Sequence, residues 1–490
     1  MKGIQFAHLG KKSAITQAVT ISSVRATKGA ATVSPFNERG MVANPSFSLV
    51  RPNGPADQFE FSVKAHALGD ECWIAEPSWH CNAGHTPGHS QQPSRQSTTF
   101  KSRSEAVDDA ISRGMRQIVG ELGDLADTPA WGKRIGDLRT WGANAVAQVR
   151  ANDETLPMRG VQVIDLACGG LGGFGMGLSS LGANVKLACD IDQNARAIYQ
   201  QNVGPMQMHD DICTLDGKGL ECDILTMGLM CQAFSKAGKG LGMQDPNLAK
   251  AYEHSMRLLA EIDAKVIIIE CVRQLLTAHG GRDAQVVRDT LLMAGYRVQH
   301  RTMNAKGFGL PQSRERVFLV ATRIGVPTDG LMGYMFPQEQ APSAVVGDIM
   351  DYHINADVEA ARIHVRKMEP TTKQASLVEV GRIDGRNSQG YRVYSAMGLG
   401  ATLTAMSGGR GQTSVYAVNG KARALTPREA GRMQGLPEWA VHHAVKTHAC
   451  KHAGNAVAIP LVRELVRPLS RALGTTRVSA GTAHMEGGAA

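Results

Sequence analysis

The stretch VQVIDLACGGLGGF, residues 161–174, contains the pattern that decides the fold. Its first six residues are mostly apolar and predict a buried strand, and the glycines that follow predict a tight turn into a helix. Glycines in such a turn permit positive φ and let a ligand approach backbone N–H groups at the start of the helix. The pattern favours a nucleotide-like cofactor, although glycine-rich turns also occur as simple tight turns.

Strands and helices alternate on the C-terminal side of this stretch. Strands are expected at residues 161–166, 185–188, 224–227, 266–269 and 316–321, and helices at 175–181, 194–202, 247–262 and 283–294. This order predicts a doubly wound, Rossmann-like α/β domain with a mainly parallel sheet, whose ligands bind at the carboxyl ends of the strands. The apolar segment 460–472 is expected to form a helix that returns to this core.

The N-terminal third differs from the rest of the chain in composition and in the spacing of its apolar residues. Residues 1–55 are rich in Ser, Thr, Gly and Ala and are expected to be mostly irregular. Alternating apolar residues predict strands at 59–67 and 72–79, and Ser102 and Glu105 form a capping box before an amphipathic helix. The predicted division is an irregular segment 1–55, a small α+β (ββα) module 56–125, a partly helical linker 126–158, the main domain 159–325, a smaller second domain 326–424, a return to the main domain 425–475 and a disordered tail 476–490.

Composition excludes several classes of protein. No apolar run approaches the length of a membrane span, so a cytoplasmic protein without membrane contact is expected. The nine cysteines show no paired spacing, which indicates reduced thiols.

A group of Cys and His residues precedes the first predicted helix, at Cys72, His80, Cys81, His85 and His89. It lacks a CxxC or HxxxH pair, so we interpret these residues as polar loop positions and expect no metal site.

Basic residues are concentrated in one segment. The net charge is +9, and residues 362–432 contain twelve Lys and Arg against four Asp and Glu. Such a concentration indicates a polyanionic partner or, as the commoner alternative, a solvated basic face.

Acidic residues follow the next two predicted strand ends. Asp190 and Asp192 follow the second strand, where a carboxylate can accept hydrogen bonds from ribose hydroxyls, and capping of the next helix is the alternative for one of them. At the following loop, the run Asp210-Asp211-Ile212 could receive an adenine amino group. The chain has no Walker lysine, which argues against ATP.

Five further motifs carry the chemistry. They are GLMCQAFS (228–235), IIIECV (267–272), GLPQSRERVF (309–318), LTPREAGRMQGLP (425–437) and GNAVAIP (454–460). In this order they resemble the cytosine-C5 DNA methyltransferases of bacteria and phages, over residues 161–465. The chemistry of such an enzyme requires a thiolate that adds to cytosine C6, so that C5 becomes nucleophilic toward a sulfonium methyl donor. Cys231 fits that need.

The resemblance implies S-adenosylmethionine as cofactor, double-stranded DNA as partner and a role for each motif. Residues 326–424 would be the target-recognition domain, and the base would be flipped out of the duplex. The implied catalytic residues are Cys231, Glu270, Arg314 and Arg316. The implied cofactor-binding residues are Asp165, Gly170, Gly172, Gly173, Phe174, Asp190, Asp211, Ile212 and Asn455. The implied DNA-binding residues are Gln232, Ser235, Gln312, Arg392, Thr402 and Arg410.

The chain departs from the family pattern near the nucleophile. Met230 stands where proline is usual, Cys271 stands where asparagine is usual, and one extra residue separates Asp165 from the glycine run. Two alternatives remain beside the main prediction, an RNA cytosine-C5 methyltransferase and a catalytically weak DNA-binding relative. We expect a monomer that functions in DNA modification with a cognate restriction endonuclease.

Overall fold

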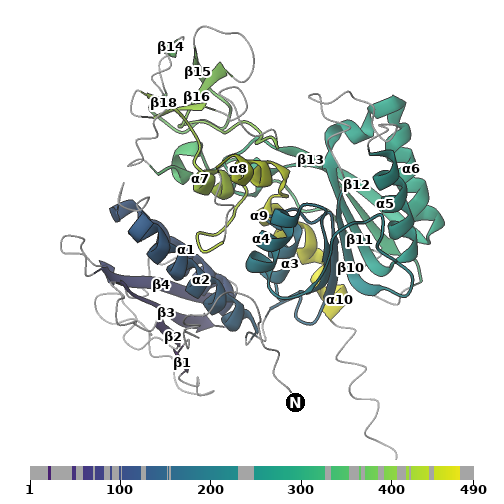
Figure 1. The fold of residues 1–490 in the computed structure, drawn as a ribbon, viewed down its shortest axis with the longest axis horizontal. Coiled ribbons are helices and arrows are strands. Elements are labelled where there is room, and N and C mark those ends of the chain that lie inside the picture. Colours follow the sequence, from purple (N-terminus) through teal and green to yellow (C-terminus); the bar gives the residue numbers. More distant parts are fainter. Residues whose placement is uncertain are drawn as a thin grey trace, which may run out of the picture.

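The computed structural model describes three sheets and the helices that pack on them (Figure 1). The described residues are 20–23, 47–50, 59–69, 72–81, 89–90, 99–100, 102–122, 129–151, 153, 156–229, 248–325, 331, 333–351, 363–365, 370–383, 391–405, 415–418, 421–440 and 446–474. The predicted tail, residues 476–490, lies outside them.

The largest sheet has seven strands in the order β12-β13-β11-β10-β7-β8-β9. Its strands are β7 (Gln162–Leu166), β8 (Asn184–Cys189), β9 (Gln207–His209), β10 (Glu221–Gly228), β11 (Asp263–Val272), β12 (Tyr296–Asn304) and β13 (Glu315–Arg323). The helices on it are α3 (Gly173–Ser179), α4 (Gln193–Val203), α5 (Ala249–Glu261), α6 (Arg282–Met293) and α9 (Ile459–Val466). Helices α3, α4 and α9 lie on one side of the sheet, and α5 and α6 lie on the other (Figure 1).

Alternating side chains of the strands build two cores. Val163 of β7 belongs to the cluster with α3 and α9, whereas its neighbour Ile164 belongs to the cluster with α5 and α6. Strand β11 is buried along most of its length because both faces of the sheet are covered. The predicted Rossmann-like domain is confirmed.

The sheet is mainly parallel, as expected, and two of its features could not be seen in the sequence. Strands β7, β8, β9, β10 and β11 run parallel to one another, whereas β13 runs antiparallel to both β11 and β12. Strands β9 and β12 were not expected. Strand β9 has only three residues. Strand β12 is an edge strand, and several of its residues are exposed. Neither strand therefore shows the apolar run that predicts the other strands.

The N-terminal sheet contains β1 (Thr20–Ser23), β2 (Phe47–Val50), β3 (Phe59–Gly69), β4 (Cys72–Cys81), β5 (His89–Ser90) and β6 (Thr99–Phe100). Strands β1 and β2 lie within segment 1–55, which is expected to be mostly irregular. These strands pair with each other and with β3, and the ladder satisfies backbone groups in segments too short to show a period.

Two helices pack on this sheet and together form, with it, the N-terminal module. They are α1 (Arg103–Leu122) and α2 (Pro129–Ala151), and α2 occupies most of the predicted linker. Ser102 Oγ accepts the Glu105 N–H at 3.1 Å, as the capping prediction requires. The Trp141 ring of α2 is 2% exposed and lies edge-on to Phe61 at 5.4 Å, so the helix belongs to the module core.

The third sheet lies within residues 352–424, which we call the recognition lobe after the role expected for residues 326–424. Its strands are β14 (Ile363–Val365), β15 (Glu379–Ile383), β16 (Arg392–Ser395), β17 (Val415–Val418) and β18 (Lys421–Ala424). The chain returns through α7 (Pro427–Arg432), α8 (Lys446–Asn455), α9, a 3-10 turn at Arg467–Leu469 and α10 (Ser470–Gly474). Among the helices in the described part of the chain, none combines the length and apolar character needed to cross a bilayer.

Candidate active site

Three parallel strands end side by side and bring the sequence motifs together. Leu166 of β7 pairs with Met227 of β10, and Gly228 of β10 pairs with Glu270 of β11. The Gly228 position approaches the glycine loop so closely that an added Cβ would lie 3.0 Å from the Ala167 carbonyl oxygen. The glycine loop and Glu270 therefore share one edge of the sheet, where parallel α/β sheets bind ligands.

The glycine loop turns sharply between β7 and α3. Ala167 has a φ of 49° and Gly172 has a φ of 61°, in the left-handed region. An added Cβ on Gly173 would lie 2.1 Å from the Val457 carbonyl oxygen, and one on Gly170 would lie 2.8 Å from His452 Nδ1. These two glycines are thus required for packing against the C-terminal return segment, which holds the loop in place.

Phe174 differs from its predicted role in cofactor binding. Its side chain is 3% exposed and belongs to the core between the sheet, α3 and α9. The ring supports the loop from inside because the start of α3 turns it toward the sheet. We correct its assignment to a packing residue.

Asp190 and the residue after it form the next part of the edge. The Asp190 carboxylate accepts the Gly169 N–H at 2.8 Å and the Asp192 N–H at 2.9 Å. Burial raises the pKa of Asp190, and these backbone hydrogen bonds lower it in part. Ile191, between the two aspartates, is 78% exposed at this edge of the sheet. The sequence prediction missed Ile191, and its only signal was an apolar residue directly after the acidic strand end.

Asp192 and Asp211 are fixed by backbone groups. Asp192 caps α4 by accepting the Asn194 and Ala195 N–H groups, so the capping alternative is confirmed for this residue. Asp211 Oδ1 accepts the Cys213 N–H at 2.8 Å, and this hydrogen bond lowers the pKa of Asp211. Its neighbour Ile212 is partly buried against the core that α5 and α6 cover.

Asp165 lies beneath the loop and is completely buried. Tyr199 donates its hydroxyl hydrogen to Asp165 Oδ2 at 2.7 Å, and Thr226 donates to Oδ1 at 2.7 Å. An added Cβ on Gly175 would lie 2.2 Å from the Tyr199 hydroxyl oxygen, so the phenol fills the space under the loop. Asp165 therefore supports the site and does not face a cofactor, and its assignment is corrected accordingly.

The stability of the loop should depend on pH through Asp165. Burial raises the pKa of Asp165 from 3.8 to about 6, against the opposing hydrogen bonds of Tyr199 and Thr226. A carboxyl with a raised folded-state pKa contributes stability that is complete below its unfolded pKa and is lost as pH rises through the folded value. Asp165→Asn should therefore match the wild type near pH 4 and become more stable by about 3 kcal/mol near pH 7. Melting curves across this range check the prediction, and parallel curves for the two proteins would contradict it.

Glu270 lies near the carboxyl end of β11, beside Arg316, the second residue of β13. Arg316 Nε lies 2.9 Å from Glu270 Oε1, in an ion pair whose N–H does not point at the oxygen. Because β13 is antiparallel to β11, the start of β13 lies at the carboxyl end of β11. The Glu270 carbonyl oxygen accepts the Leu229 N–H at 3.0 Å. The predicted carboxylate and one predicted arginine are therefore together.

Arg314 has a different role from the one predicted. Its side chain is 3% exposed, and its guanidinium donates to the carbonyl oxygens of Leu403 at 3.0 Å, Gly454 at 2.8 Å and Ala456 at 2.9 Å. Two of these carbonyls flank Asn455, which is exposed. Arg314 thus fixes the backbone around Asn455, and we correct its assignment from a catalytic residue to a positioning residue.

Gln312 cannot contact DNA in this arrangement because its side chain is completely buried. Its Nε2 donates to the Met433 carbonyl oxygen at 2.9 Å, and its Oε1 accepts the Leu403 N–H at 2.9 Å. Thr402 is partly buried and donates its hydroxyl hydrogen to the Ser313 carbonyl oxygen at 2.5 Å. Gln312 is therefore corrected to a residue that joins the recognition lobe to the main domain.

The basic segment divides into internal and accessible charges. Arg423 and Arg432 are each 4% exposed and lie in buried ion pairs, so they do not contribute to a basic surface. Arg392 on β16 has a side chain that is 39% exposed, with Nε 3.5 Å from Glu379 Oε2. Arg423 and Arg432 therefore stabilise the fold, although the sequence counts them in the basic segment that indicates a polyanionic partner. Arg392 remains accessible to solvent.

Several predicted residues lie outside the described part of the chain. They are Cys231, Gln232, Ser235 and Arg410, together with Met230. Cys271 is described, and it is completely buried in β11 opposite Val317 of β13.

Comparisons with known proteins identify the family. The family model described as C-5 cytosine-specific DNA methylase matches residues 161–471. The chain is 31% identical over 323 residues to the Type II methyltransferase M.HhaI of Haemophilus parahaemolyticus, which covers 64% of this chain and 96% of the relative. It is 29% identical over 310 residues to the Type II methyltransferase M.NgoBI of Neisseria gonorrhoeae, which covers 61% and 90%. The solved structure of the S. pombe Dnmt2 methyltransferase matches with a TM-score of 0.46 and 18% identity, over 63% of this chain and 98% of that one. The chain belongs to the C-5 cytosine-specific DNA methylases and is a DNA cytosine-5-methyltransferase.

Proposed function

We propose that this enzyme methylates C5 of cytosine within one double-stranded DNA sequence, with Cys231 as the nucleophile. The observation that carries the proposal is the Leu229 N–H donated to the Glu270 carbonyl oxygen at 3.0 Å. The segment with Cys231 begins directly after Leu229, so it leaves the sheet beside the carboxylate. This order supports a thiol and an acid acting on one base.

The proposed chemistry assigns a proton or an electron pair to each group. The Cys231 thiolate adds to C6 of a flipped cytosine while the Glu270 carboxyl holds a proton at N3, so that electron density moves to C5. After methyl transfer, solvent water takes the proton from C5, the C5–H electron pair re-forms the C5–C6 double bond, and Cys231 sulfur leaves with the electron pair of the carbon–sulfur bond as the thiolate. Arg316 keeps Glu270 in position through the ion pair at 2.9 Å.

The residues at the sheet edge fit S-adenosylmethionine, which supplies an electrophilic methyl group when bound. Asp190 presents a carboxylate for ribose hydroxyls, and Ile191 presents an exposed apolar surface for a purine ring. The ionised Asp211 suits an amino group of the adenine. Gly172 has the left-handed φ that turns the loop at this edge of the sheet, and Asn455 would close the site from the return segment.

DNA recognition is assigned to the recognition lobe, with Arg392, Arg410 and Thr402 as predicted contacts beside Gln232 and Ser235 of the Cys231 segment. Arg392→Ala should weaken DNA binding because a guanidinium that neutralises a phosphate releases counterions. The slope of log affinity against log salt should fall by about one, and the affinity for S-adenosylmethionine should stay unchanged. Fluorescence anisotropy at several salt concentrations measures the slope.

A matched control for Arg392→Ala is Arg288→Ala, which removes the same charge from the exposed face of α6. This helix lies on the main domain, away from the recognition lobe (Figure 1). Equal salt slopes for Arg392→Ala and the wild type, or an equal loss in both variants, would remove Arg392 from the DNA surface.

The proposed function itself is tested by bisulfite sequencing of the plasmid and host DNA after expression. The expected result is complete protection of cytosines within one recurring sequence, because one recognition lobe supports one specificity. The two relatives reported above are both named Type II methyltransferases, which supports a role in DNA modification beside a cognate restriction endonuclease. Unmodified DNA from cells that contain the folded enzyme would overturn the proposal.

A further inference from the structure

The N-terminal module lies outside the part of the chain that the family model matches, yet it packs directly on that part. Trp439, in the return segment, is 2% exposed and donates its indole N–H to Asp108 Oδ1 of α1 at 2.6 Å. Arg150 of α2 donates to Asp108 Oδ2 at 2.6 Å and lies over the Trp439 ring at 5.7 Å. Asp108 therefore joins both module helices to the return segment.

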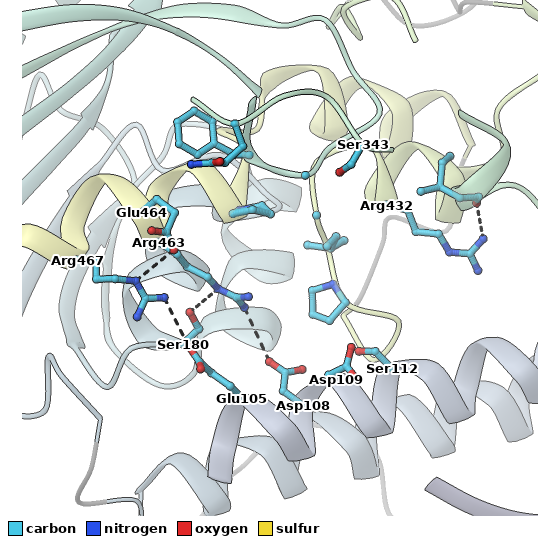
Figure 2. A pocket seen from close by; sticks show the side chains of 18 of the residues that line it. Glu105, Asp108, Asp109, Ser112, Ser180, Ser343, Arg432, Arg463, Glu464 and Arg467 are labelled. Carbon is cyan, nitrogen blue, oxygen red and sulfur yellow. Dashed lines mark hydrogen bonds and ion pairs between the residues drawn. The ribbon is translucent and has the colours of Figure 1, made fainter. Parts of the chain in front are cut away.

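Further ion pairs cross the same boundary along a pocket of about 680 Å³ (Figure 2). Arg463 of α9 lies 4.0 Å from Asp108, and Arg467 lies 3.7 Å from Glu105 of α1. These pairs are partly exposed and contribute little individually. They show that the α1 face of the module carries carboxylates where the main domain presents guanidinium groups.

Glu438, which precedes Trp439, extends the contact inward. It is 4% exposed, accepts a hydrogen bond from Arg432 Nε and lies 3.7 Å from Arg116 of α1. Its carbonyl oxygen accepts the Arg139 Nε–H of α2 at 3.1 Å. Burial raises the pKa of Glu438, but Arg432, Arg116 and Arg139 outweigh that effect and hold it below its ordinary value. Glu438 is therefore an ionised link between the module and Arg432.

The network continues to both chain segments that connect the recognition lobe to the main domain. Arg432 Nη1 lies 2.7 Å from Asp351 Oδ1, and Asp351 is the last described residue before the lobe. Asp351 donates its N–H to Glu429 Oε1 at 2.7 Å, and Glu429 accepts two hydrogen bonds of 2.7 Å from Arg423 of β18. The entry and exit of the lobe are thus tied to one buried set of charges.

We propose that the N-terminal module is a brace that sets the orientation of the recognition lobe over the active site, with Asp108 and Trp439 as positioning residues. A buried ion network holds one arrangement because loss of one partner leaves another charge buried without compensation. Helices α1 and α2 contact this network from the side of the module, through Arg116 and Arg139 to Glu438, so the module fixes the angle of the lobe. The consequence for DNA binding rests on the proposed function, whereas the consequence for the lobe does not.

The test compares two substitutions in the full-length protein that remove the same charge. Asp108→Asn removes the carboxylate that joins Trp439 to Arg150, and Asp137→Asn removes an exposed carboxylate on α2. Two readouts are used, hydrogen exchange of the β15–β18 amides without DNA, and steady-state methylation of an oligonucleotide that carries the sequence found by bisulfite sequencing.

With Asp108→Asn, exchange in the recognition lobe should rise, and the KM for DNA should rise roughly two- to thirtyfold. The kcat at saturating DNA and the affinity for S-adenosylmethionine should stay within about twofold of the wild type, and Asp137→Asn should match the wild type in every readout. Trp439→Phe, which keeps an aromatic ring but removes the N–H donor, should reproduce the effect and guards against misfolding of the first variant.

Three results would overturn the brace. The first is a folded Asp108→Asn variant whose amide exchange in the lobe equals that of the wild type. The second is an effect of Asp137→Asn as large as that of Asp108→Asn. The third is a loss of affinity for S-adenosylmethionine in Asp108→Asn as large as its loss of affinity for DNA. If the wild type does not methylate DNA, the proposed function fails, and the exchange comparison alone decides for or against the brace.

Discussion

Cys231→Ala is expected to abolish both methylation and the covalent capture of DNA that contains 5-fluorocytosine. A free thiol has a pKa of roughly 8.5, so only a few per cent is thiolate at neutral pH unless nearby cations lower the pKa. Once the thiolate has added to C6 and the methyl group has moved, the fluorine blocks the proton loss from C5 that release requires. The adduct should therefore persist on a denaturing gel with the wild type and be absent with the variant.

Cys271→Ala is the matched control, because it removes a second thiol one residue after Glu270. Cys271 is completely buried inside the sheet, where a base cannot reach it. The substitution shortens a small buried side chain, so it should cost roughly 1 kcal/mol of stability and retain both adduct and methylation. Capture that required Cys271 and not Cys231 would move the nucleophile and refute the site assignment.

The main fold could be predicted because its signals are local. Residues 161–174 combine a strand and a glycine turn within one window, and the apolar run of β11 reflects burial on both faces. Strand β12 could not be predicted in the same way, because an edge strand is held by its ladder with β13 and needs no apolar period. The same reason explains β1 and β2, which have four residues each.

The roles of single residues were harder to predict than their places. Glu270 and Asp190 lie where the strand ends required. Arg314 is expected from the resemblance to be catalytic, yet its guanidinium donates to a carbonyl oxygen 140 positions away in the sequence. Gln312 likewise has partners 91 and 121 positions away. Residue type and spacing show that a polar group is present, but they do not show which distant backbone group will satisfy it.

The same limit applies to the N-terminal module. Asp108 and Arg150 resemble surface charges on amphipathic helices when only the sequence is considered. Their common partner, Trp439, is separated from Asp108 by 331 positions. A contact between residues so far apart leaves no local pattern in the sequence. The sequence therefore predicts only a partly helical linker at 126–158, whereas the structure shows that α2 belongs to the interface with the return segment.

Glu270→Gln should lower kcat by about 10²–10⁴-fold while leaving DNA and cofactor binding nearly unchanged. The amide keeps the shape of the carboxyl group but cannot hold an exchangeable acidic proton at N3, so addition of the thiolate to C6 loses its assistance. Single-turnover methylation under saturating DNA isolates this step from product release. Calorimetric titration with S-adenosylmethionine checks that the sheet edge is intact.

The control for Glu270→Gln is Glu315→Gln, which alters another glutamate paired with an arginine at the same end of the sheet. Glu315 is exposed and lies 3.3 Å from Arg273, whereas Glu270 is 7% exposed and lies 2.9 Å from Arg316. Since an exposed pair of this kind is worth about 0–1 kcal/mol, Glu315→Gln should keep kcat within about twofold.

Glu270→Gln also removes the ion pair between Glu270 and Arg316, so Arg316→Lys is the second control. This variant keeps a positive charge but loses the planar guanidinium group. A rate loss for Arg316→Lys equal to that for Glu270→Gln would assign the effect to the ion pair, whereas a much smaller loss would assign it to the proton that Glu270 holds.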